Sequence, residues 1–379
     1  MKQYIYADNA ATTRLDEEAF EVMKPFLLDY YGNASQPYSF SRQCKKALKD
    51  ARNTIADCIG ALPEEIFFTS GGSESNNWAI KGIAFYHGKS KAIVTSQIEH
   101  HSILTSCKMM ESLGYPAAYV GTDENGVIQP EKFKNFISSP SIVSIMMANN
   151  EIGSVQMIKE LAEIAHDKGA VFHTDAVQAV GHIPVDVQKL GVDMLSASAH
   201  KFNGPKGIGF LYIRKGTSIY PLINGGQQEN SMRAGTENIP SIVAMAAALK
   251  RNCTNMEMNI KKLLSFEQVF LDLLNSAGID FIRNGSENHI PGNVSVSFKR
   301  QSGEMLLHRL DLMGICVSTG SACDSKETQI SHVLKAIGLD ESYAKGTIRV
   351  SFGKDNTVEE AEKIARSLIS IISPNNTKK

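Results

Sequence analysis

A lysine follows an apolar segment and precedes a turn containing glycine and proline in SASAHKFNGPKG, residues 196–207. An amine just past a strand end can reach the crevice at the carboxyl edge of a parallel sheet, where ligands bind in open α/β folds. There the amine of Lys201 could form a Schiff base with an aldehyde. Taken alone, a solvated surface lysine is the more ordinary interpretation, because the chain has 39 Lys and Arg residues.

An aspartate ends the apolar segment of FHTDAVQAVG, residues 172–181. A carboxylate at this position could pair with the pyridine nitrogen of pyridoxal phosphate (PLP) and keep it protonated, so that the ring withdraws electrons. The alternative is that Asp175 only caps the helix that follows.

Two further segments have the composition of a binding site. TSGGSESNN at 69–77 is rich in glycine and hydroxyl groups, and free backbone N–H groups at the start of a helix suit a phosphate. A histidine in QIEHHSIL at 97–104 could stack on a ring or move protons. A plain strand-to-helix turn and a surface histidine are the alternatives. Because all four features follow expected strand ends in one chain order, together they predict a PLP site.

The elements that position these residues alternate between strands and helices from about residue 50 to 215. Strands are expected in EEIFFTSGG, KAIVTS, SIVSIMMA, AVFHTDA, MLSASA and IGFLYI, and helices in SESNNWAIKGIAFY, SILTSCKMMESLG and MIKELAEIAHDKG. Such alternation is typical of a mostly parallel sheet covered on both faces. After a long helical region, strands are expected in IDFIRN, NVSVSF and TIRVSF, and a helix in GEMLLHRLDLMG. The sequence predicts an α/β protein with a large domain, 15–258, and a smaller α+β domain, 1–14 and 259–379.

Composition narrows the classes of partner and location. The formal net charge of the 379 residues is −1, which implies no strong attraction to nucleic acid or to an anionic membrane. The apolar segments are too short to span a bilayer, and the first residues lack the apolar region of a signal peptide, so we expect a cytoplasmic protein. The six cysteines are scattered without a C-x-x-C pair, which argues against a zinc site or a disulfide framework.

At the level of whole motifs, the chain resembles the cysteine desulfurases of the PLP-dependent class V aminotransferase group. The motifs that carry the resemblance are YADNAAT, YGNAS, TSGGSESNN, EHHS, NNEIG, HTDAVQ, SAHKFNGPKG, RAGTEN, STGSACDS and TIRVSFG. They extend over nearly the whole chain. GSAC followed by a long insertion and HVLKAIG is similar to the subgroup with the longer catalytic-cysteine loop. The resemblance implies a PLP-dependent transferase fold of the aspartate aminotransferase type.

The resemblance also implies roles around the cofactor that the motifs alone do not assign. Lys201 is expected to form the Schiff base with PLP, Asp175 to pair with the pyridinium nitrogen, and Gln178 to contact the ring hydroxyl. His100 is expected to stack on the ring and to transfer protons. The family's Glu-His order favours His100 over His101.

Further residues are expected to hold the phosphate and the substrate. The expected phosphate ligands are Gly72, Ser73, Ser198 and His200. Thr236 is expected to reach the phosphate of the neighbouring subunit's site, which implies a homodimer. Asn150 and Arg349 are expected to bind the substrate carboxylate, and the planar fork of an arginine suits that task.

The implied activity converts L-cysteine to L-alanine and leaves the sulfur as a persulfide on Cys323, whose thiolate is the nucleophile. The implied acceptor is an iron–sulfur scaffold or a tRNA-thiolation protein. Asp324 departs from the family pattern, and its charge should raise the thiol pKa. The segment 318–331 has almost no apolar anchor, so we expect a mobile loop. A selenocysteine lyase, a class V aminotransferase and a non-catalytic scaffold for sulfur-transfer proteins are the alternatives.

Overall fold

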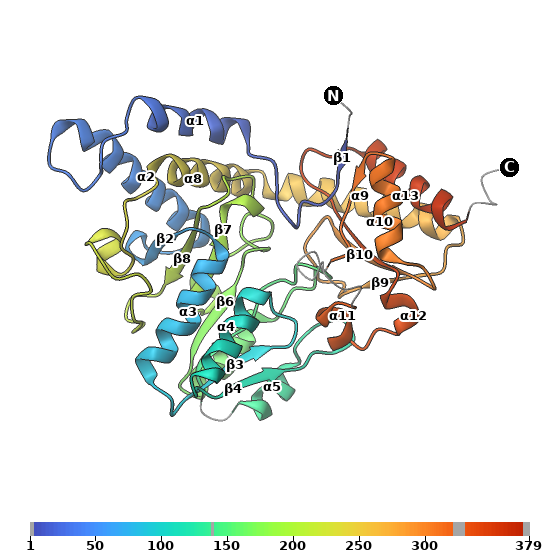
Figure 1. Cartoon of the computed structure of the whole chain (residues 1–379), viewed down its shortest axis with the longest axis horizontal. Helices are drawn as coiled ribbons and strands as arrows, with labels where there is room; N and C mark the ends of the chain where they lie inside the picture. Colours follow the sequence, from blue (N-terminus) through green and yellow to red (C-terminus); the bar gives the residue numbers. More distant parts are fainter. Residues whose placement is uncertain (1–3, 138–139, 321–329, 374–379) are drawn as a thin grey trace.

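The larger part of the molecule is built on a seven-stranded sheet in the order β2-β8-β7-β6-β5-β3-β4 (Figure 1). The computed structural model describes residues 4–137, 140–320 and 330–373. The strands are β2 (Ile66–Thr69), β3 (Ala92–Ser96), β4 (Ala117–Val120), β5 (Pro140–Ser144), β6 (Val171–Asp175), β7 (Met194–Ser198) and β8 (Gly209–Ile213). Strand β8 is antiparallel to both of its neighbours, and the other pairs are parallel. This confirms the mostly parallel sheet.

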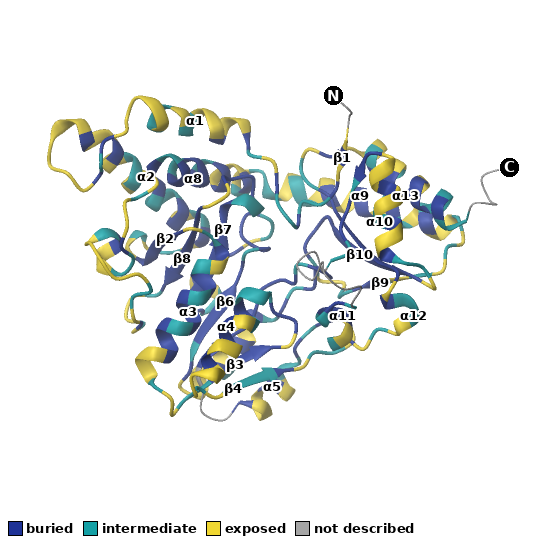
Figure 2. Cartoon of the chain, viewed as in Figure 1, coloured by how far each residue is buried: buried dark blue, intermediate teal, exposed yellow. Residues whose placement is uncertain are grey.

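Helices cover both faces of this sheet. The helices of this part are α1 (Glu17–Leu28), α2 (Arg42–Ile59), α3 (Gly72–His87), α4 (His101–Ser112), α5 (Pro130–Phe136), α6 (Ile158–Asp167), α7 (Val187–Leu190) and α8 (Ile239–Thr254). Successive side chains of a strand point to opposite faces. In β8, accordingly, Phe210 and Tyr212 pack in the core with α2, α6 and α8, whereas Leu211 and Ile213 pack with α3 and α4. The strands are therefore buried almost throughout (Figure 2).

The second part is smaller and combines an antiparallel sheet with three longer and two short helices. Its sheet has the order β12-β10-β9 and is formed by β9 (Phe281–Asn284), β10 (Asn293–Phe298) and β12 (Thr347–Ser351). The helices are α9 (Met256–Ser276), α10 (Gly303–Leu312), α11 (His332–Ala336), α12 (Glu341–Ala344) and α13 (Val358–Ile372). This confirms the smaller α+β unit. No helix within the described ranges is long and apolar enough to cross a membrane.

The N-terminal segment belongs to the smaller part by its packing. Strand β1 (Ile5–Tyr6) pairs in parallel with β11 (Ile315–Cys316). Ile5 and Ala7 are buried in the same core as Phe266, Val296 and Leu368. We propose on this ground that residues 1–14 belong to the smaller domain, as expected from sequence. The expected boundary at 258/259 falls within α9 and stays a prediction.

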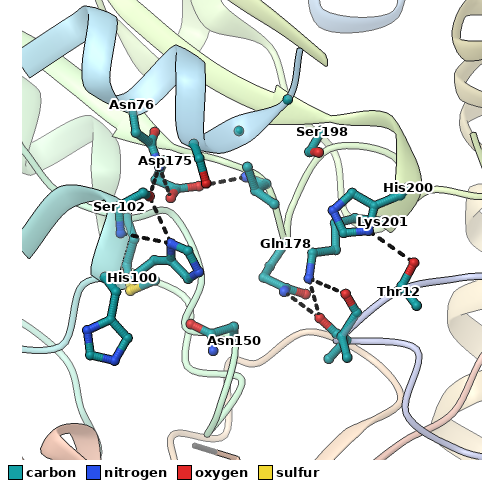
Figure 3. Close-up of a pocket in the computed structure, with 18 of the residues that line it drawn as sticks. Thr12, Asn76, His100, Ser102, Asn150, Asp175, Gln178, Ser198, His200 and Lys201 are labelled. Atoms are coloured by element: carbon teal, nitrogen blue, oxygen red, sulfur yellow. Dashed lines mark hydrogen bonds between the residues drawn. The ribbon is translucent and has the colours of Figure 1, made fainter. Parts of the chain in front are cut away.

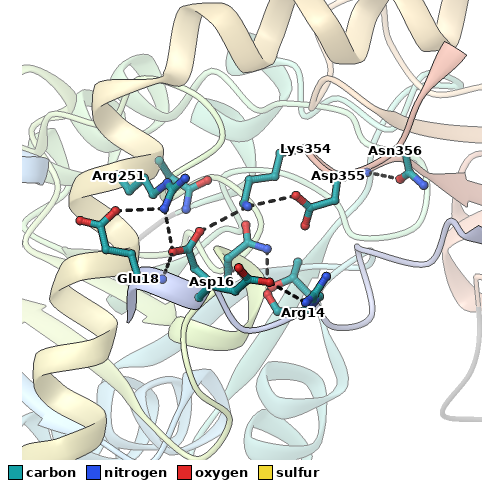
Figure 4. A network of polar contacts seen from close by, with 12 residues as sticks. Arg14, Asp16, Glu18, Arg251, Lys354, Asp355 and Asn356 are labelled. Carbon is teal, nitrogen blue, oxygen red and sulfur yellow. Dashed lines mark hydrogen bonds and ion pairs between the residues drawn. The ribbon is translucent and has the colours of Figure 1, made fainter. Parts of the chain in front are cut away.

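A buried aspartate joins the two parts where the chain passes from one to the other (Figure 4). Asp16 caps helix α1 by accepting hydrogen bonds from the backbone N–H groups of Glu18 and Ala19. Its carboxylate also lies 3.1 Å from Arg251 of α8 and 3.3 Å from Lys354, which follows β12. Burial opposes ionisation of Asp16, but the hydrogen bond and charge of Lys354, with the help of Arg251, hold its pKa below the usual value.

We predict that Asp16→Asn lowers the free energy of unfolding by roughly 1–2 kcal/mol at neutral pH, because Asn still caps a helix but cannot pair with Lys354 and Arg251. A lowered native pKa stabilises the fold above the unfolded pKa, and this contribution is lost as the pH falls through the native value. Urea unfolding of both proteins between about pH 3 and pH 7 measures the difference. It should be largest at neutral pH and decrease toward the acidic end, and a difference independent of pH would contradict the ion-pair role.

Candidate functional site

A cavity of about 530 Å³ lies where the carboxyl ends of the central strands face the smaller part of the molecule. Ten of the twelve residues expected from sequence line it: Gly72, Ser73, His100, Asn150, Asp175, Gln178, Ser198, His200, Lys201 and Arg349. Figure 3 shows that the labelled residues among them approach the space from several sides, with His100 and Asp175 on one side and Lys201 and His200 on the other. The structure therefore brings together residues that lie up to 277 positions apart, from Gly72 to Arg349.

Lys201 is placed by a single turn of 3-10 helix, Ala199–Lys201, that follows strand β7 directly. Its Nζ atom donates hydrogen bonds to the carbonyl oxygens of Ala10 (2.6 Å) and Ala11 (2.8 Å). Its own carbonyl oxygen lies 2.9 Å from Nε2 of His182. The amine therefore reaches the cavity from a fixed backbone, and the N-terminal segment holds it there.

Asp175 is the last residue of strand β6, and its two carboxylate oxygens have different partners. Oδ2 accepts a hydrogen bond of 2.6 Å from Nδ2 of Asn76, and Oδ1 accepts one of 3.0 Å from the backbone N–H of Val177. The second contact caps a turn and not the helix that the alternative interpretation expected, because the next helix in the described chain, α7, begins only at Val187. The first contact turns the carboxylate toward α3 in the wall of the cavity.

His100 is the N-cap residue of helix α4, and its ring is tied to the helix that it begins. Nδ1 accepts a hydrogen bond of 3.1 Å from the backbone N–H of Ser102 and lies 2.8 Å from the hydroxyl of the same residue. Burial lowers the pKa of His100, and the negative charge of Asp175 opposes that shift. His101 also lines the cavity, but its ring packs against His332, with 5.0 Å between the ring centroids.

The glycine-rich segment forms a close turn into helix α3. Gly71 has φ +147°, and a Cβ atom on Gly72 would lie 2.6 Å from Cγ2 of Val177. Any larger residue at Gly72 would therefore collide with the segment after Asp175. The first N–H groups of a helix have no partner within the helix, and those of α3 begin at the cavity wall beside Ser73.

Three further polar side chains line the cavity, those of Gln178, Ser198 and His200. Nε2 of Gln178 donates a hydrogen bond of 3.0 Å to the carbonyl oxygen of Ala10. Nδ1 of His200 lies 3.1 Å from the hydroxyl of Thr12. Burial, together with the charges of Lys201 and Lys206, lowers the pKa of His200 to about 4. Ser198 ends strand β7 beside them.

Arg349 extends from strand β12 of the smaller part and is buried, with 3% of its side chain exposed. Nη2 donates a hydrogen bond of 2.6 Å to Oδ1 of Asp8, and Nη1 donates one of 2.8 Å to the carbonyl oxygen of Asn150. The two residues expected to bind a carboxylate are therefore in direct contact. Asp8, which belongs to the N-terminal segment, holds the guanidinium group of Arg349 in place.

Two expected residues are not in this cavity. Thr236 is exposed and lies outside the set of lining residues, so its expected role in a neighbouring subunit stays a prediction. Cys323 lies outside the described residues, as does Asp324. The residues that flank this segment are fixed: Ser318 pairs with Arg349 in a β-bridge, and the hydroxyl of Ser331 donates a hydrogen bond of 2.6 Å to Glu151. The expected mobility of the loop 318–331 therefore stays a prediction, although Ser318 and Ser331 at its two ends make the contacts given above.

Several polar residues of the site were not singled out from sequence, although each lies inside a quoted motif. They are Asp8, Thr12, Asn76, Glu99, Ser102 and Glu151. Glu99 is fully buried, and burial raises its pKa to about 8, although hydrogen bonds from Ser96 and Met146 favour the charged form. The available signal was a polar residue without an assigned role inside one of these motifs. That signal does not predict which other residue the side chain contacts.

The residues present fit PLP by the chemistry of their donors and acceptors. The helix start and the hydroxyl of Ser198 suit a phosphate, the carboxylate of Asp175 suits a protonated ring nitrogen, and the amine of Lys201 suits an aldehyde. All four line one cavity of a size suited to a small cofactor with its substrate.

Comparisons with known proteins agree along nearly the whole chain. The family model for class V aminotransferases matches residues 5–364. A cysteine desulfurase IscS of Dictyoglomus turgidum is 48% identical over 363 residues, which cover 95% of this chain and 92% of that protein. A solved structure described as a NifS-like protein superposes with a TM-score of 0.92 at 37% identity, covering 98% of this chain and 100% of that chain.

Another solved structure is described as SspA in complex with cysteine. It superposes with a TM-score of 0.82 at 35% identity, covering 92% of this chain and 98% of that chain. These superpositions confirm the PLP-dependent transferase fold that the motifs imply.

We predict that Asp175→Asn weakens PLP binding by about tenfold or more, because a neutral amide loses a charge-assisted hydrogen bond worth about 1.5–3 kcal/mol. Equilibrium dialysis with the absorbance of bound PLP measures the affinity. Thermal unfolding of the cofactor-free proteins is the control for folding, since Asn retains an acceptor for Val177. Equal PLP affinity in the two proteins would leave Asp175 as no more than a turn cap.

Proposed function

The chain belongs to the class V aminotransferase family and is a cysteine desulfurase, and we propose that Cys323 receives the sulfur of L-cysteine as a persulfide. The family implies PLP as the cofactor. The outer sulfur of the persulfide then passes to an acceptor protein in the cytoplasm, either an iron–sulfur scaffold or a tRNA-thiolation protein. The acceptor rests on the resemblance of the motifs, and the location rests on the expectation from the sequence.

The chain's own residues would hold the cofactor and the substrate as follows. The start of α3 with Gly72 and Ser73, together with Ser198 and His200, binds the phosphate. Asp175 keeps the ring nitrogen protonated, Gln178 contacts the ring hydroxyl, and His100 lies against the ring. Arg349, with Asn150 beside it, binds the α-carboxylate of cysteine. The geometry supports this division, because the first group lies on the large sheet and Arg349 faces it from the smaller part.

When bound, PLP withdraws electrons from the α- and β-carbons of the amino acid joined to it, which weakens the carbon–sulfur bond. The Lys201 amine is in a position to remove and return the Cα proton, because it enters the same cavity from the end of β7. The carbonyl oxygens of Ala10 and Ala11 accept hydrogen bonds from this amine. They stabilise its protonated form after it has taken a proton.

Sulfur transfer requires the thiolate of Cys323, because a neutral thiol is a poor nucleophile. The thiolate forms a sulfur–sulfur bond with the substrate while the carbon–sulfur bond breaks. The electron pair of the broken bond stays with the β-carbon, which takes up a proton and becomes the methyl group of L-alanine. The enzyme is left with the persulfide.

A single observation carries this proposal: the residues on both sides of the segment that holds Cys323 lie at the cavity. Gly320 lines the cavity, and Ser331 is hydrogen-bonded to Glu151, which also lines it. Three residues of chain span at most about 11 Å, so a cysteine three positions after Gly320 has the reach to enter the cavity.

We predict that Cys323→Ala keeps PLP bound but forms no persulfide and releases no sulfide from cysteine. The substitution removes the nucleophile without touching the residues that hold the cofactor. The absorbance of bound PLP and mass spectrometry of the protein after incubation with cysteine measure the two properties. A persulfide on Cys107 or Cys316, or wild-type sulfide release, would contradict the assignment.

In the same experiment, Arg349→Ala tests the binding of the substrate carboxylate. Loss of the charge-assisted contact with the carboxylate should raise KM for cysteine by about 30-fold, as expected for about 2 kcal/mol. The persulfide on Cys323 should still form at high cysteine concentration. A normal KM would mean that another residue binds the carboxylate.

We also propose that the protein is a homodimer in which Thr236 completes the neighbouring site. Thr236 lies away from the cavity of its own chain, and the segment 20–40 exposes large apolar side chains, among them Leu28 at 67% and Tyr31 at 73%. Such a surface is typical of a protein interface. Sedimentation should show a dimer, and Thr236→Ala should weaken PLP binding. A monomer with full activity would contradict the proposal.

A further inference from the structure

A carboxylate lies at the helix start that is proposed to bind the phosphate. Glu74 belongs to the first turn of α3, directly after Gly72 and Ser73, and lines the cavity with them. A phosphate monoester carries a charge of about −1.5 to −2 at neutral pH. Because like charges repel each other, an ionised Glu74 opposes the binding of such a group. The helix start therefore needs a positive charge that offsets this carboxylate.

Arg233 brings a positive charge to Glu74 from a distant segment of the chain. Its Nε donates a hydrogen bond of 2.9 Å to Oε1, and its Nη2 donates one of 3.2 Å to Oε2. Both side chains are mostly buried, with 21% of Arg233 and 12% of Glu74 exposed, so this bidentate pair is stronger than a solvated surface pair. Burial opposes ionisation of Glu74, but hydrogen bonds from Arg233 and Ser70 hold its pKa below the usual value.

The carboxylate does not occupy the N–H groups that a phosphate would use. Oε2 of Glu74 accepts a hydrogen bond of 2.8 Å from the backbone N–H of Ser70, which precedes the helix. In the part of the chain that the structure describes, the backbone N–H groups of Gly72 and Ser73 donate no hydrogen bond. They remain available to an anion, as at other helix starts. Glu74 therefore acts on a bound phosphate through its charge and not by blocking donors.

The expected phosphate ligands carry no positive charge of their own. Glycine and serine are uncharged, and burial, together with the charges of Lys201 and Lys206, lowers the pKa of His200 to about 4, which leaves its ring neutral. Lys206 is exposed, and the amine of Lys201 is directed to two backbone carbonyl oxygens of the N-terminal segment. The cation that contacts the helix start directly is Arg233.

Glu229 is a second carboxylate whose charge acts on Arg233, but it has a partner of its own. Nη2 of Arg52 lies 2.6 Å from Oε1 of Glu229, and Oε2 accepts a hydrogen bond of 3.0 Å from the backbone N–H of Phe68. The side chain of Glu229 is 3% exposed, so these contacts fix the segment that leads to Arg233. The charge of Arg233 is thus left to Glu74.

We propose that Arg233 is a positioning residue for the cofactor, which neutralises Glu74 and thereby allows the start of α3 to bind the phosphate of PLP. This inference rests on the proposed function of the cavity as the PLP site. Without Arg233, Glu74 either stays ionised beside the phosphate or has to take up a proton, and both weaken binding at neutral pH. Arg233 precedes Thr236 by three positions, so one segment would serve the phosphate of its own site and that of the neighbouring subunit.

Variants that change the charges of this pair test the proposal with PLP and with pyridoxal, which lacks the phosphate. We expect Arg233→Gln to weaken PLP binding by about tenfold or more and to leave the affinity for pyridoxal unchanged. Glu74→Gln keeps an acceptor for Ser70 and should bind PLP at least as tightly as the wild type. The double variant Glu74→Gln/Arg233→Gln should restore PLP affinity to within about threefold of the wild type. Equilibrium dialysis of the cofactor-free proteins measures these affinities, and thermal unfolding is the control for folding.

Three results would overturn the proposal. One is an equal loss of PLP affinity in Glu74→Gln and Arg233→Gln, because either substitution breaks a purely structural ion pair. The others are a double variant as weak as Arg233→Gln, and an equal loss of affinity for pyridoxal. Glu74→Gln alone decides the point if Arg233→Gln does not fold. A wild-type protein that binds PLP no better than pyridoxal would refute the proposed phosphate site itself, and the inference with it.

Discussion

The contact between the amine of Lys201 and the carbonyl oxygens of Ala10 and Ala11 is the constraint on which the site depends. The N-terminal segment packs its first residues into the core of the smaller part and then crosses the crevice to meet Lys201. On its way it supplies Asp8 to Arg349, and beyond the crevice it supplies Asp16 to Arg251 and Lys354. One segment therefore positions the amine, the guanidinium and the relative placement of the two parts.

Much of this arrangement could be predicted from sequence because parallel strands impose it. Asp175 and Lys201 follow the strands β6 and β7, whose carboxyl ends lie at one edge of the sheet. Apolar segments that end in a polar residue mark such positions without any knowledge of the fold. The same reasoning missed the edge strand β4, which has only four residues, of which Ala117 to Tyr119 are only partly buried.

The partners of the expected residues could not be predicted in this way. Asn76 and Ser102 come from two helices and meet at Asp175 and His100 only through the packing of α3 on α4. Asp8 and Arg349 are separated by 341 residues. Within each motif, the sequence does not distinguish these polar residues from their neighbours, because their contacts arise from tertiary packing. The local cap of His100 is the exception, because an N-cap and the residue two positions later are neighbours in any helix.

Several charged and polar groups that line the cavity are held by partners on the protein. Arg349 is neutralised by Asp8, and the carboxylate of Asp175 is engaged by Asn76 and Val177. The rings of His100 and His200 are both kept neutral by burial, since their pKa values are lowered. The carbonyl oxygens of Ala10 and Ala11 accept hydrogen bonds from the amine of Lys201. The proposed ligand of the substrate carboxylate and the proposed base therefore have different partners: Asp8 for Arg349, and two carbonyl oxygens for Lys201.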